Sequence, residues 1–298
     1  MLKGLALTPP VIGRISIGKL VEKNGRRLPE KDDEFTITSQ VQDKEGWIPH
    51  PFNESLRKTP QDKLRSIPVR LLFDDPELNL RANYSLFDRK TGRPLCVGNG
   101  DTCRRSTTAG VTTLPCPSPE GCEMAQGGNC KPYGRLNVRI GDDDELGSFV
   151  FRTTGFNSIR ALSTRLQYFQ AVSGGHLSTL PLELQLRGKS TTQSHRAPIY
   201  YVDLAVQTGF TLAKAIAQAK AEVEVRASAG FDQAALDDAA RKGFAVGAFE
   251  ESEEDGTAIV EEFFPEEGEE GQGTTRIKVQ PGLLEKLEGK AVLLRKPG

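Results

Sequence analysis

Five cysteines fall within one short stretch of the chain and are absent from the rest of it. They are Cys96, Cys103, Cys116, Cys122 and Cys130, separated in turn by six, twelve, five and seven residues. Cysteine is usually a scattered, buried residue, so clustering among Gly, Pro, Ser, Asp and Glu needs a cause. Four thiolates that converge on one ion form a closed tetrahedral zinc site. The spacing predicts a structural Zn²⁺ held by four of the five cysteines, with Cys116, Cys122 and Cys130 the most compact set.

A disulfide framework and a set of independent core cysteines are the two alternatives to a metal site. A disulfide framework requires an oxidising compartment, but the apolar N-terminal run is short and is broken by Pro9 and Pro10, unlike a secretory signal. Independent core cysteines would need apolar neighbours, which this stretch does not offer. No run approaches the roughly 18 apolar residues of a membrane span. We therefore expect a cytoplasmic protein with no membrane partner.

Basic residues directly follow two of the cysteines. A bound metal would hold both basic groups on one rigid surface, which suits charge-assisted contact with phosphates. The alternative is that these cations only shield nearby thiolates and carboxylates. The candidates for nucleic-acid contact are Arg104, Arg105, Lys131, Arg135 and Arg139. Tyr133, among them in sequence, is expected in the core rather than stacked on a base.

The net charge of −1 hides an uneven distribution of charge. Residues 250–270 contain eleven acids and no base, so the remainder of the chain has 39 bases against 29 acids. A basic body with an acidic appendage fits a nucleic-acid partner, or a tail that competes with that partner for the positive surface. The appendage also fits a solvated linker with no further role.

Motifs for other chemistry are missing or weak. The chain has no GxxxxGK[ST] phosphate loop, no GxSxG nucleophile elbow and no HExxH metal motif. Its three histidines, His50, His176 and His195, lie far apart in sequence. The acidic runs 74–75 and 142–144 occupy predicted turns, where Asp is common for backbone reasons. Since a closed tetrathiolate site leaves no position for water or substrate, we expect no catalytic residue, no enzyme activity and no small-molecule substrate.

Hydrophobic periodicity predicts an α+β fold, mainly antiparallel sheet with one packed amphipathic helix. The helix is expected at Ser158–Val172, capped by Asn157 or Ser158 and stopped at Gly174. The cysteine-bearing stretch 96–134 is expected to be loop-rich and ordered by metal. The predicted strands are a hairpin over 11–48 with its turn at 24–25, then 67–73, 84–88, 135–140, 148–154, 180–187 and 199–206; further helices are predicted at 208–229 and 232–242.

The expected organisation has four parts. Residues 1–206 form a β-rich core domain with a cysteine zinc knuckle inserted at 94–134. Residues 207–247 form a helical extension. An acidic, disordered segment follows at 248–273, and a basic C-terminal segment occupies 274–298, so that the C-terminal extension is helical and partly disordered.

The residues resemble a known family over roughly residues 11–206. The resemblance rests on Cys116-Pro-Ser-Pro-Glu-Gly-Cys122, on Cys130-Lys-Pro-Tyr-Gly-Arg-Leu and on the run from Gly147 to Arg160. The opening Gly13–Lys19, Phe35–Ser39 and Leu180–Leu184 add to it. These motifs are similar to the recombination directionality factor-like family of phages and integrative conjugative elements, whose proteobacterial branch is commonly labelled "hydrolase or metal-binding protein". The helix and acidic tail after residue 207 depart from that pattern.

The resemblance implies a small accessory factor of a mobile genetic element that binds an integrase and redirects it, without being an enzyme. The expected function is thus a zinc-binding accessory protein in DNA recombination, with DNA and a site-specific recombinase as partners. One alternative is a DNA-binding protein of element replication or repair. A second is a metal-dependent hydrolase or nuclease, and a third is a counter-defence protein.

Overall fold

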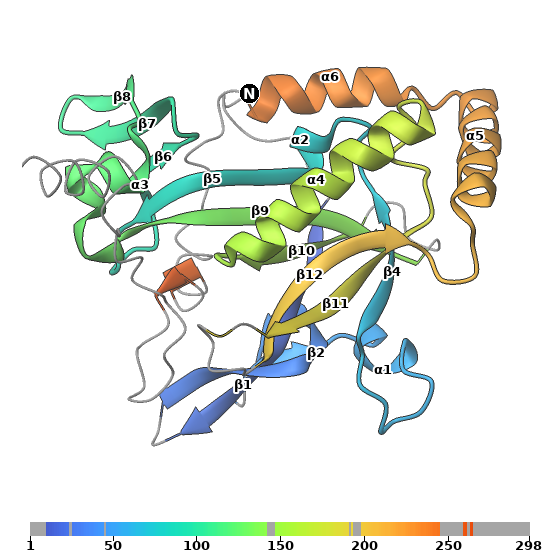
Figure 1. The fold of residues 1–298 in the computed structure, drawn as a ribbon, viewed down its shortest axis with the longest axis horizontal. Helices are drawn as coiled ribbons and strands as arrows, with labels where there is room; N and C mark the ends of the chain where they lie inside the picture. The colour runs from blue at the N-terminus through green and yellow to red at the C-terminus, as the bar shows by residue number, and fades with distance from the viewer. Residues whose placement is uncertain are drawn as a thin grey trace, which may run out of the picture. The chain divides into compact units, whose positions relative to one another are not determined.

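The computed structural model describes residues 10–23, 26–44, 46–141, 147–190, 192, 198–244, 259–260 and 263–264. Except for Ser190, Thr192 and Pro198, these residues belong to one compact unit, Met1–Lys189 with Ile199–Glu266. Within the described residues the fold is α+β, with a twelve-stranded, mostly antiparallel mixed sheet (Figure 1). No helix in these ranges is long and apolar enough to cross a membrane.

The strands are β1 Val11–Lys23, β2 Arg26–Gln42, β3 Trp47–Pro49, β4 Ser66–Leu71, β5 Leu80–Phe87, β6 Pro94–Gly98, β7 Thr102–Thr107, β8 Gly110–Pro115, β9 Cys130–Ile140, β10 Ser148–Thr153, β11 Leu182–Ser190 and β12 Pro198–Val206. The helices are α1 Phe52–Ser55, α2 Pro76–Asn79, α3 Ser118–Gly121, the 3₁₀ segment η1 Glu123–Gly128, α4 Phe156–Ser173, α5 Leu212–Ser228 and α6 Gln233–Phe244.

Strand β9 is the shared strand of the sheet. One edge pairs with β10, which continues through a parallel pairing to β1 and then to β2 and β3. The other edge pairs first with β5 over Cys130–Leu136 and then with β4 over Val138–Ile140. Because β9 is eleven residues long, it accommodates both neighbours in succession. The sheet therefore forks: β5 leads to β6, β7 and β8, whereas β4 leads to β11 and β12.

The hairpin predicted over 11–48 is confirmed as the antiparallel pair β1–β2. Its alternating apolar residues Ile15, Phe35 and Ile37 are fully buried in the main core, as a period of two requires for a strand with one face inward. The turn predicted at residues 24–25 and the acidic turn at 142–144 lie outside the described residues. The predicted strands on either side of each turn are present.

The cysteine-bearing stretch contains more regular structure than we expected from the sequence. Instead of a loop, Pro94–Pro115 forms three short antiparallel strands, β6, β7 and β8. The β6–β7 turn is closed by Asn99, whose Oδ1 accepts hydrogen bonds of 2.9 Å from both Asp101 N and Thr102 N. Gly100 in that turn has φ 102°, which favours glycine. The prediction of a loop-rich stretch was wrong because strands this short are too brief to show a clear hydrophobic period in the sequence.

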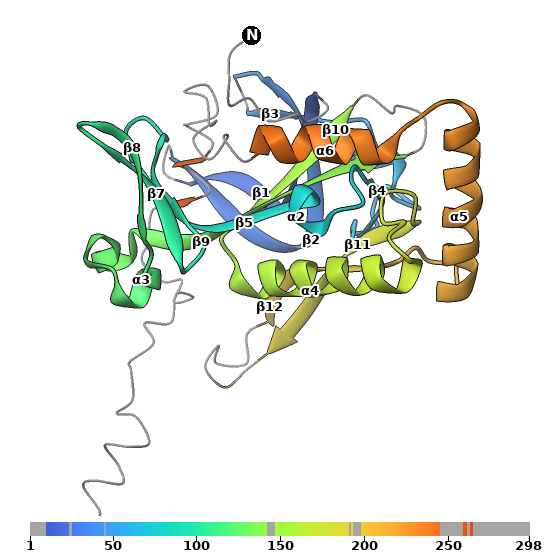
Figure 2. The same cartoon turned by 90° about the horizontal axis from the view of Figure 1, so that it is seen from above.

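Helix α4 confirms the predicted amphipathic helix but not its cap. Gly155 is the N-cap and offers no side chain, while the hydroxyl of Ser158 accepts a hydrogen bond from Val202 N at 3.0 Å. The helix ends at Gly174, with φ 73°, as predicted. Its apolar stripe packs on β9 closely, since a Cβ on Gly134 would lie 2.9 Å from Ile159 Cγ1. Figure 2 shows α4 on one side of β5 and α6 on the other.

Candidate metal and nucleic-acid sites

The β5 branch of the forked sheet brings the five cysteines close together. Cys96 on β6 and Cys130 on β9 both pair with Leu86, from opposite sides of β5. Cys103 on β7 pairs with Gly98. Cys116 follows β8 and is held by a 2.8 Å hydrogen bond from its N–H to Asp101 O. Cys122 lies between α3 and η1, which lead back into β9. Strand pairing thus brings the two ends of the cysteine-bearing stretch together.

Two of the thiols, Cys103 and Cys130, have raised pKa values. Burial, followed by the charges of Cys96, Cys122, Cys116 and Cys103 in that order, raises the pKa of Cys130 to about 12. Burial and a hydrogen bond with Cys96 raise the pKa of Cys103 to about 11, and Cys116 adds to the shift. A thiolate at Cys103 or Cys130 is therefore unfavourable, chiefly because the group is buried and in part because neighbouring thiolates repel its charge. A cation among them would reverse this penalty, because it favours the deprotonated form.

Gly98 packs directly against two of these cysteines. A Cβ added to it would lie 2.7 Å from Cys103 Cβ and 2.8 Å from Cys116 Sγ, so only glycine admits both side chains. Zinc prefers thiolates, so the residue types present suit it. As the side chains stand, no group of three or more His, Cys, Asp or Glu within the described residues is arranged to hold a metal ion. Zinc binding therefore stays a prediction.

The opposite face of the same strands is basic. Along β9, Leu136, Val138 and Ile140 enter the main core, so the alternate residues Arg135, Asn137 and Arg139 face the other way. Cross-strand partners share a face, and Arg135 pairs with Arg81 on β5 and with Arg152 on β10. We define this arginine face by Arg14, Arg70, Arg81, Arg104, Lys131, Arg135, Arg139 and Arg152.

The arginine face has two parts that differ in exposure. Arg14, Arg70 and Arg139 are only 7–8% exposed. The guanidinium of Arg14, for example, is held by Gln40 Oε1 at 2.9 Å and lies 4.0 Å from the centre of the Trp47 ring. The other five members are half-buried. Each of the eight has an interaction partner within the chain. A phosphate reaching this face would therefore have to replace existing partners of the half-buried residues.

The predicted nucleic-acid residues divide between the two faces. Arg104, Lys131, Arg135 and Arg139 lie on the arginine face, although Arg139 is too buried to meet a ligand here. We expected all five residues on one surface, but Arg105 lies on the cysteine side, where it pairs with Cys96. A hydrogen bond with Cys96 is the chief cause of its raised pKa. Tyr133 is buried as predicted.

Sequence reasoning missed four members of the face, Arg14, Arg70, Arg81 and Arg152. Arg70, Arg81 and Arg152 are each the single basic residue of an otherwise apolar or neutral strand, whereas β1 also carries Lys19 and Lys23, and none of the four adjoins a cysteine in sequence. The only available signal was their position in the strand alternation. Pairing between strands, which the sequence does not state, turns these isolated cations into a continuous surface.

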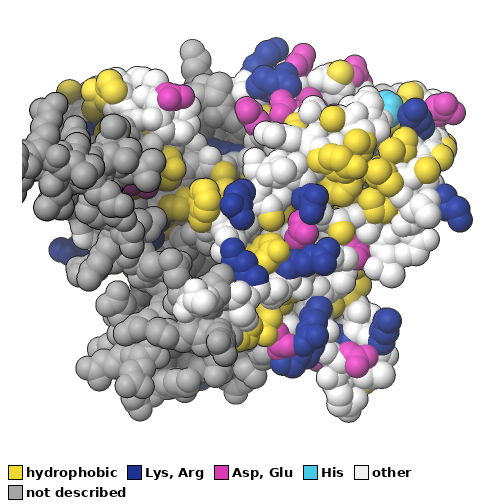
Figure 3. Space-filling model, viewed as in Figure 1, with side chains coloured by type: hydrophobic (Ala, Val, Ile, Leu, Met, Phe, Trp, Pro, Cys, Tyr) yellow, Lys and Arg dark blue, Asp and Glu magenta, His cyan; other side chains and the backbone are white. Residues whose placement is uncertain are grey.

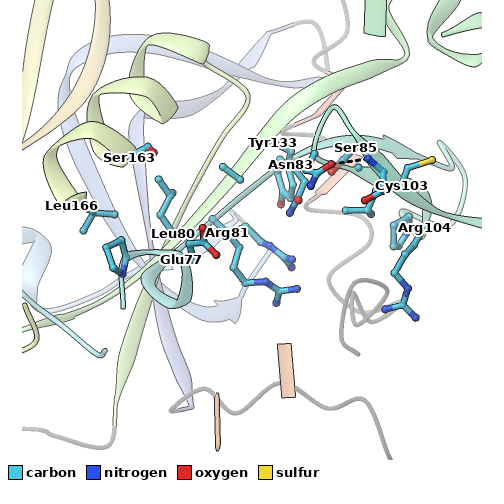
Figure 4. A pocket seen from close by; sticks show the side chains of 18 of the residues that line it. Glu77, Leu80, Arg81, Asn83, Ser85, Cys103, Arg104, Tyr133, Ser163 and Leu166 are labelled. Atoms are coloured by element: carbon cyan, nitrogen blue, oxygen red, sulfur yellow. Dashed lines mark hydrogen bonds between the residues drawn. The ribbon is translucent and has the colours of Figure 1, made fainter. Parts of the chain in front are cut away.

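An open cavity of about 530 Å³ adjoins the arginine face. It lies along the edge of β5. Strand β6 pairs with β5 only from Tyr84 onward, so Leu80–Asn83 have no neighbouring strand on that edge and line the cavity. Ser163 and Leu166 of α4 line one side, and Arg81 and Arg104 line the other. In Figure 4 the guanidinium groups of Arg81 and Arg104 project away from α4. The cavity thus lies between α4 and a basic rim.

The α4 side of the molecule carries basic residues in a different setting. Figure 3 shows Lys and Arg side chains lying among Asp and Glu side chains on this side. Arg165 on α4 and Arg187 on β11 both bind Asp203, at 3.2 and 3.3 Å. In contrast, no Asp or Glu occupies the positions of β5, β9 or β10 that belong to the arginine face. The two sides therefore differ in local charge balance.

The fold and these clusters define the class: an α+β protein built on one forked, mostly antiparallel sheet, with cysteines on one side and arginines on the other. The chain belongs to the recombination directionality factor-like family, whose family model matches residues 12–207. That range contains all five cysteines and the whole arginine face. Comparison with curated proteins and with solved structures gave no match.

Proposed function

We propose that this chain is a non-enzymatic, zinc-binding accessory protein of a mobile genetic element, which acts in DNA recombination through contacts with DNA and a site-specific recombinase. Family membership suggests a role in recombination. The observation that carries the DNA contact is the row Arg81–Arg135–Arg152 across three paired strands. Three cations side by side on adjacent strands, about 5 Å apart, can meet a phosphate backbone without reading its sequence.

The proposed zinc ligands are Cys96, Cys116, Cys122 and Cys130. Cys103 is assigned as the fifth thiol for two reasons. It has the weakest influence of the four neighbours on the pKa of Cys130. Its Sγ is also buried and lies 3.7 Å from Pro115 O, to which it can donate a weak hydrogen bond. When bound, the metal would crosslink β6 to β9 and to the loop between α3 and η1, which stiffens β9, the strand that carries Lys131, and β6, the neighbour of the Arg104 strand β7.

The nucleic-acid contact is assigned to the half-buried part of the arginine face. Arg104 and Lys131 stand at the β7 and β9 ends of one cross-strand row, and Arg81 and Arg135 form the next pair along β5 and β9. Because phosphate contacts are electrostatic, the resulting affinity should fall steeply with salt and vary little with DNA sequence. The recombinase partner would then determine which DNA site is bound. We place this activity in the cytoplasm of the host of a phage or integrative conjugative element.

The test combines DNA binding with a recombination assay. The purified full chain is mixed with the recombinase encoded by the same element and with plasmids that report integration or excision. We expect the wild type to change the ratio of the two products. Arg81→Ala with Arg135→Ala should weaken DNA binding and this change of ratio, whereas the matched pair Arg165→Ala with Arg187→Ala should alter neither.

Three further outcomes would contradict the proposal, and two of them point to other functions. Equal effects of the two pairs of substitutions would contradict the role of the arginine face. DNA binding with no effect on any recombinase would instead support a replication or repair protein. Divalent-dependent cleavage of DNA would support a hydrolase and refute a non-enzymatic role.

A further inference from the structure

A short segment near the end of the described chain packs on the arginine face. It consists of Ile259, Val260, Phe263 and Phe264, which we call the aromatic anchor. Phe264 N donates a 2.8 Å hydrogen bond to Val260 O, as in a helical turn. Ile259 and Phe263 are fully buried, and they form a small apolar cluster with Phe87 and Tyr133.

The anchor makes specific contacts with two strands. The ring of Phe263 meets Phe87 edge-on at 4.8 Å and Tyr133 at 5.9 Å between centres. Lys131 Nζ donates a 3.1 Å hydrogen bond to Phe263 O. The guanidinium of Arg89 lies 4.5 Å from the centre of the Phe264 ring, within cation–π range. Aromatic, polar and cation–π contacts therefore converge on one short segment, which argues for a defined binding position.

The contacts place the anchor on the basic side of the sheet. Phe87, Lys131 and Tyr133 alternate with the cysteine-side residues Leu86 and Cys130, so they share the face of Arg135. Figure 2 shows the segment, drawn in orange-red, on the opposite side of β5 from α4. Its contact with Lys131 also engages one of the five half-buried cations of the arginine face.

The sequence around the anchor is strongly acidic. Glu261 and Glu262 lie inside it, and Glu266 and Glu267 follow Phe264 after a single proline. Since consecutive Cα atoms are about 3.8 Å apart, chain connectivity keeps these charges close to wherever the two phenylalanines bind. An acidic peptide bound by aromatic side chains to a basic face offers that face the same kind of charge as a phosphate backbone.

We propose that the aromatic anchor is an intramolecular competitor of nucleic acid, which occupies part of the arginine face until DNA displaces it. The proposal rests on the proposed function, because it takes the arginine face as the DNA-contact surface. A tethered segment experiences an effective concentration on the order of millimolar. Even a weak contact is then mostly formed, yet a polyanion with many phosphates can replace it. The anchor would therefore set a threshold for DNA binding rather than block it.

The first test requires no DNA. A labelled peptide with the sequence of residues 257–267 is added to the full chain, and binding is followed by fluorescence anisotropy. Wild type, whose site is filled by its own anchor, should bind the peptide about tenfold or more weakly than the full-length variant Phe263→Ala with Phe264→Ala. A peptide carrying the same two substitutions serves as control. Equal binding by the two proteins, or no binding by either, would refute the intramolecular contact.

The second test measures DNA affinity at fixed salt. The same double variant should bind a mixed-sequence duplex about tenfold more tightly than wild type. Glu261→Gln with Glu262→Gln, which keeps the aromatic rings, should give a smaller gain. Phe231→Ala, which removes an exposed ring between α5 and α6, is the matched control and should change nothing.

The two tests fail in distinguishable ways. If wild type binds DNA and the double variant binds it no better, competition is refuted while the proposed function survives. If neither protein binds DNA although the peptide result holds, the DNA role and the competition fall together, and only the intramolecular contact remains. Circular dichroism melting curves verify that each variant is folded.

Discussion

Cys96 and Cys130 flank the same residue, Leu86, from the two strands that pair with β5. The next residue along β9, Lys131, points to the other side, and so does Arg104 relative to its neighbours Cys103 and Arg105. The sheet therefore separates thiols from most of the basic residues that adjoin them in sequence. An ion held on one side would stiffen strands whose cations act on the other.

Metal content is the first prediction. Purified full-length protein should carry about one zinc ion per chain, because a closed site takes four thiolates. Cys122→Ser and Cys130→Ser should lose the ion and lower the melting temperature. Cys103→Ser should keep it, since Cys103 is the proposed fifth thiol. The measurements are elemental analysis and thermal unfolding with and without a chelator. A metal-free wild type, or zinc loss in Cys103→Ser alone, would contradict the assignment.

Gly98 supplies a test of the packing beneath the cysteines. In Gly98→Ala, the new methyl group would clash with Cys103 Cβ at 2.7 Å and Cys116 Sγ at 2.8 Å. We expect the free energy of unfolding to fall by about 1–3 kcal/mol, the usual cost of overpacking, together with weaker zinc retention. Gly188→Ala on β11 is the matched control, because its nearest neighbour is the Tyr200 ring at 3.3 Å. Equal losses in the two variants would show that the cysteine cluster is not specially tight.

Arg104 and Arg105 are adjacent in sequence but lie on opposite faces, which makes each the control for the other. Arg104→Ala should weaken binding to all duplexes alike and reduce the slope of log affinity against log salt by about 1. Arg105→Ala should leave that slope unchanged and instead weaken zinc retention, because Arg105 bonds with Cys96. Binding titrations at several salt concentrations distinguish the two. The same loss of slope in both variants would argue against the separation of faces.

Glu183 gives a prediction about pH. Burial raises its pKa, but hydrogen bonds from Thr208 N at 2.9 Å, the Gln185 amide and the Thr208 hydroxyl at 3.0 Å outweigh burial, so the pKa is lowered overall. A lowered pKa in the folded state adds stability above the ordinary carboxyl pKa of about 4.3, and that stability is lost as pH falls through the folded value.

The corresponding variant is Glu183→Gln. Because one oxygen acceptor becomes a donor facing Thr208 N, unfolding at pH 7 should become easier by about 1–3 kcal/mol. The difference from wild type should shrink below pH 4, where the carboxyl of the wild type is increasingly protonated. Denaturant titrations at the two pH values measure it. Glu222→Gln, which breaks a surface ion pair with Arg226, should have little effect at either pH. A pH-independent loss in Glu183→Gln would rule out the charge as the cause.

Local patterns were sufficient for most elements of the fold. The alternation in β1 and β2 and the apolar stripe of α4 report which residues face inward, because one face of each element is buried. The glycine at the end of α4 was readable for the same reason, since its positive φ is a local property. Ser158 was misjudged as a cap because its hydroxyl binds Val202, a residue distant in sequence.

The sequence by itself determined that five thiols lie in one polar stretch, that basic residues follow two of them and that an acidic run comes late in the chain. Only the tertiary structure decided that β9 pairs with β10, β5 and β4. These pairings align Arg81, Arg135 and Arg152 on one face, and the pairing of β6 with β7 places Arg105 on the other. It also decided that Phe263 binds beside Tyr133. The physical reason is that the direction of a side chain follows from its place in its own strand, whereas its neighbours depend on which distant strands pair and in what register.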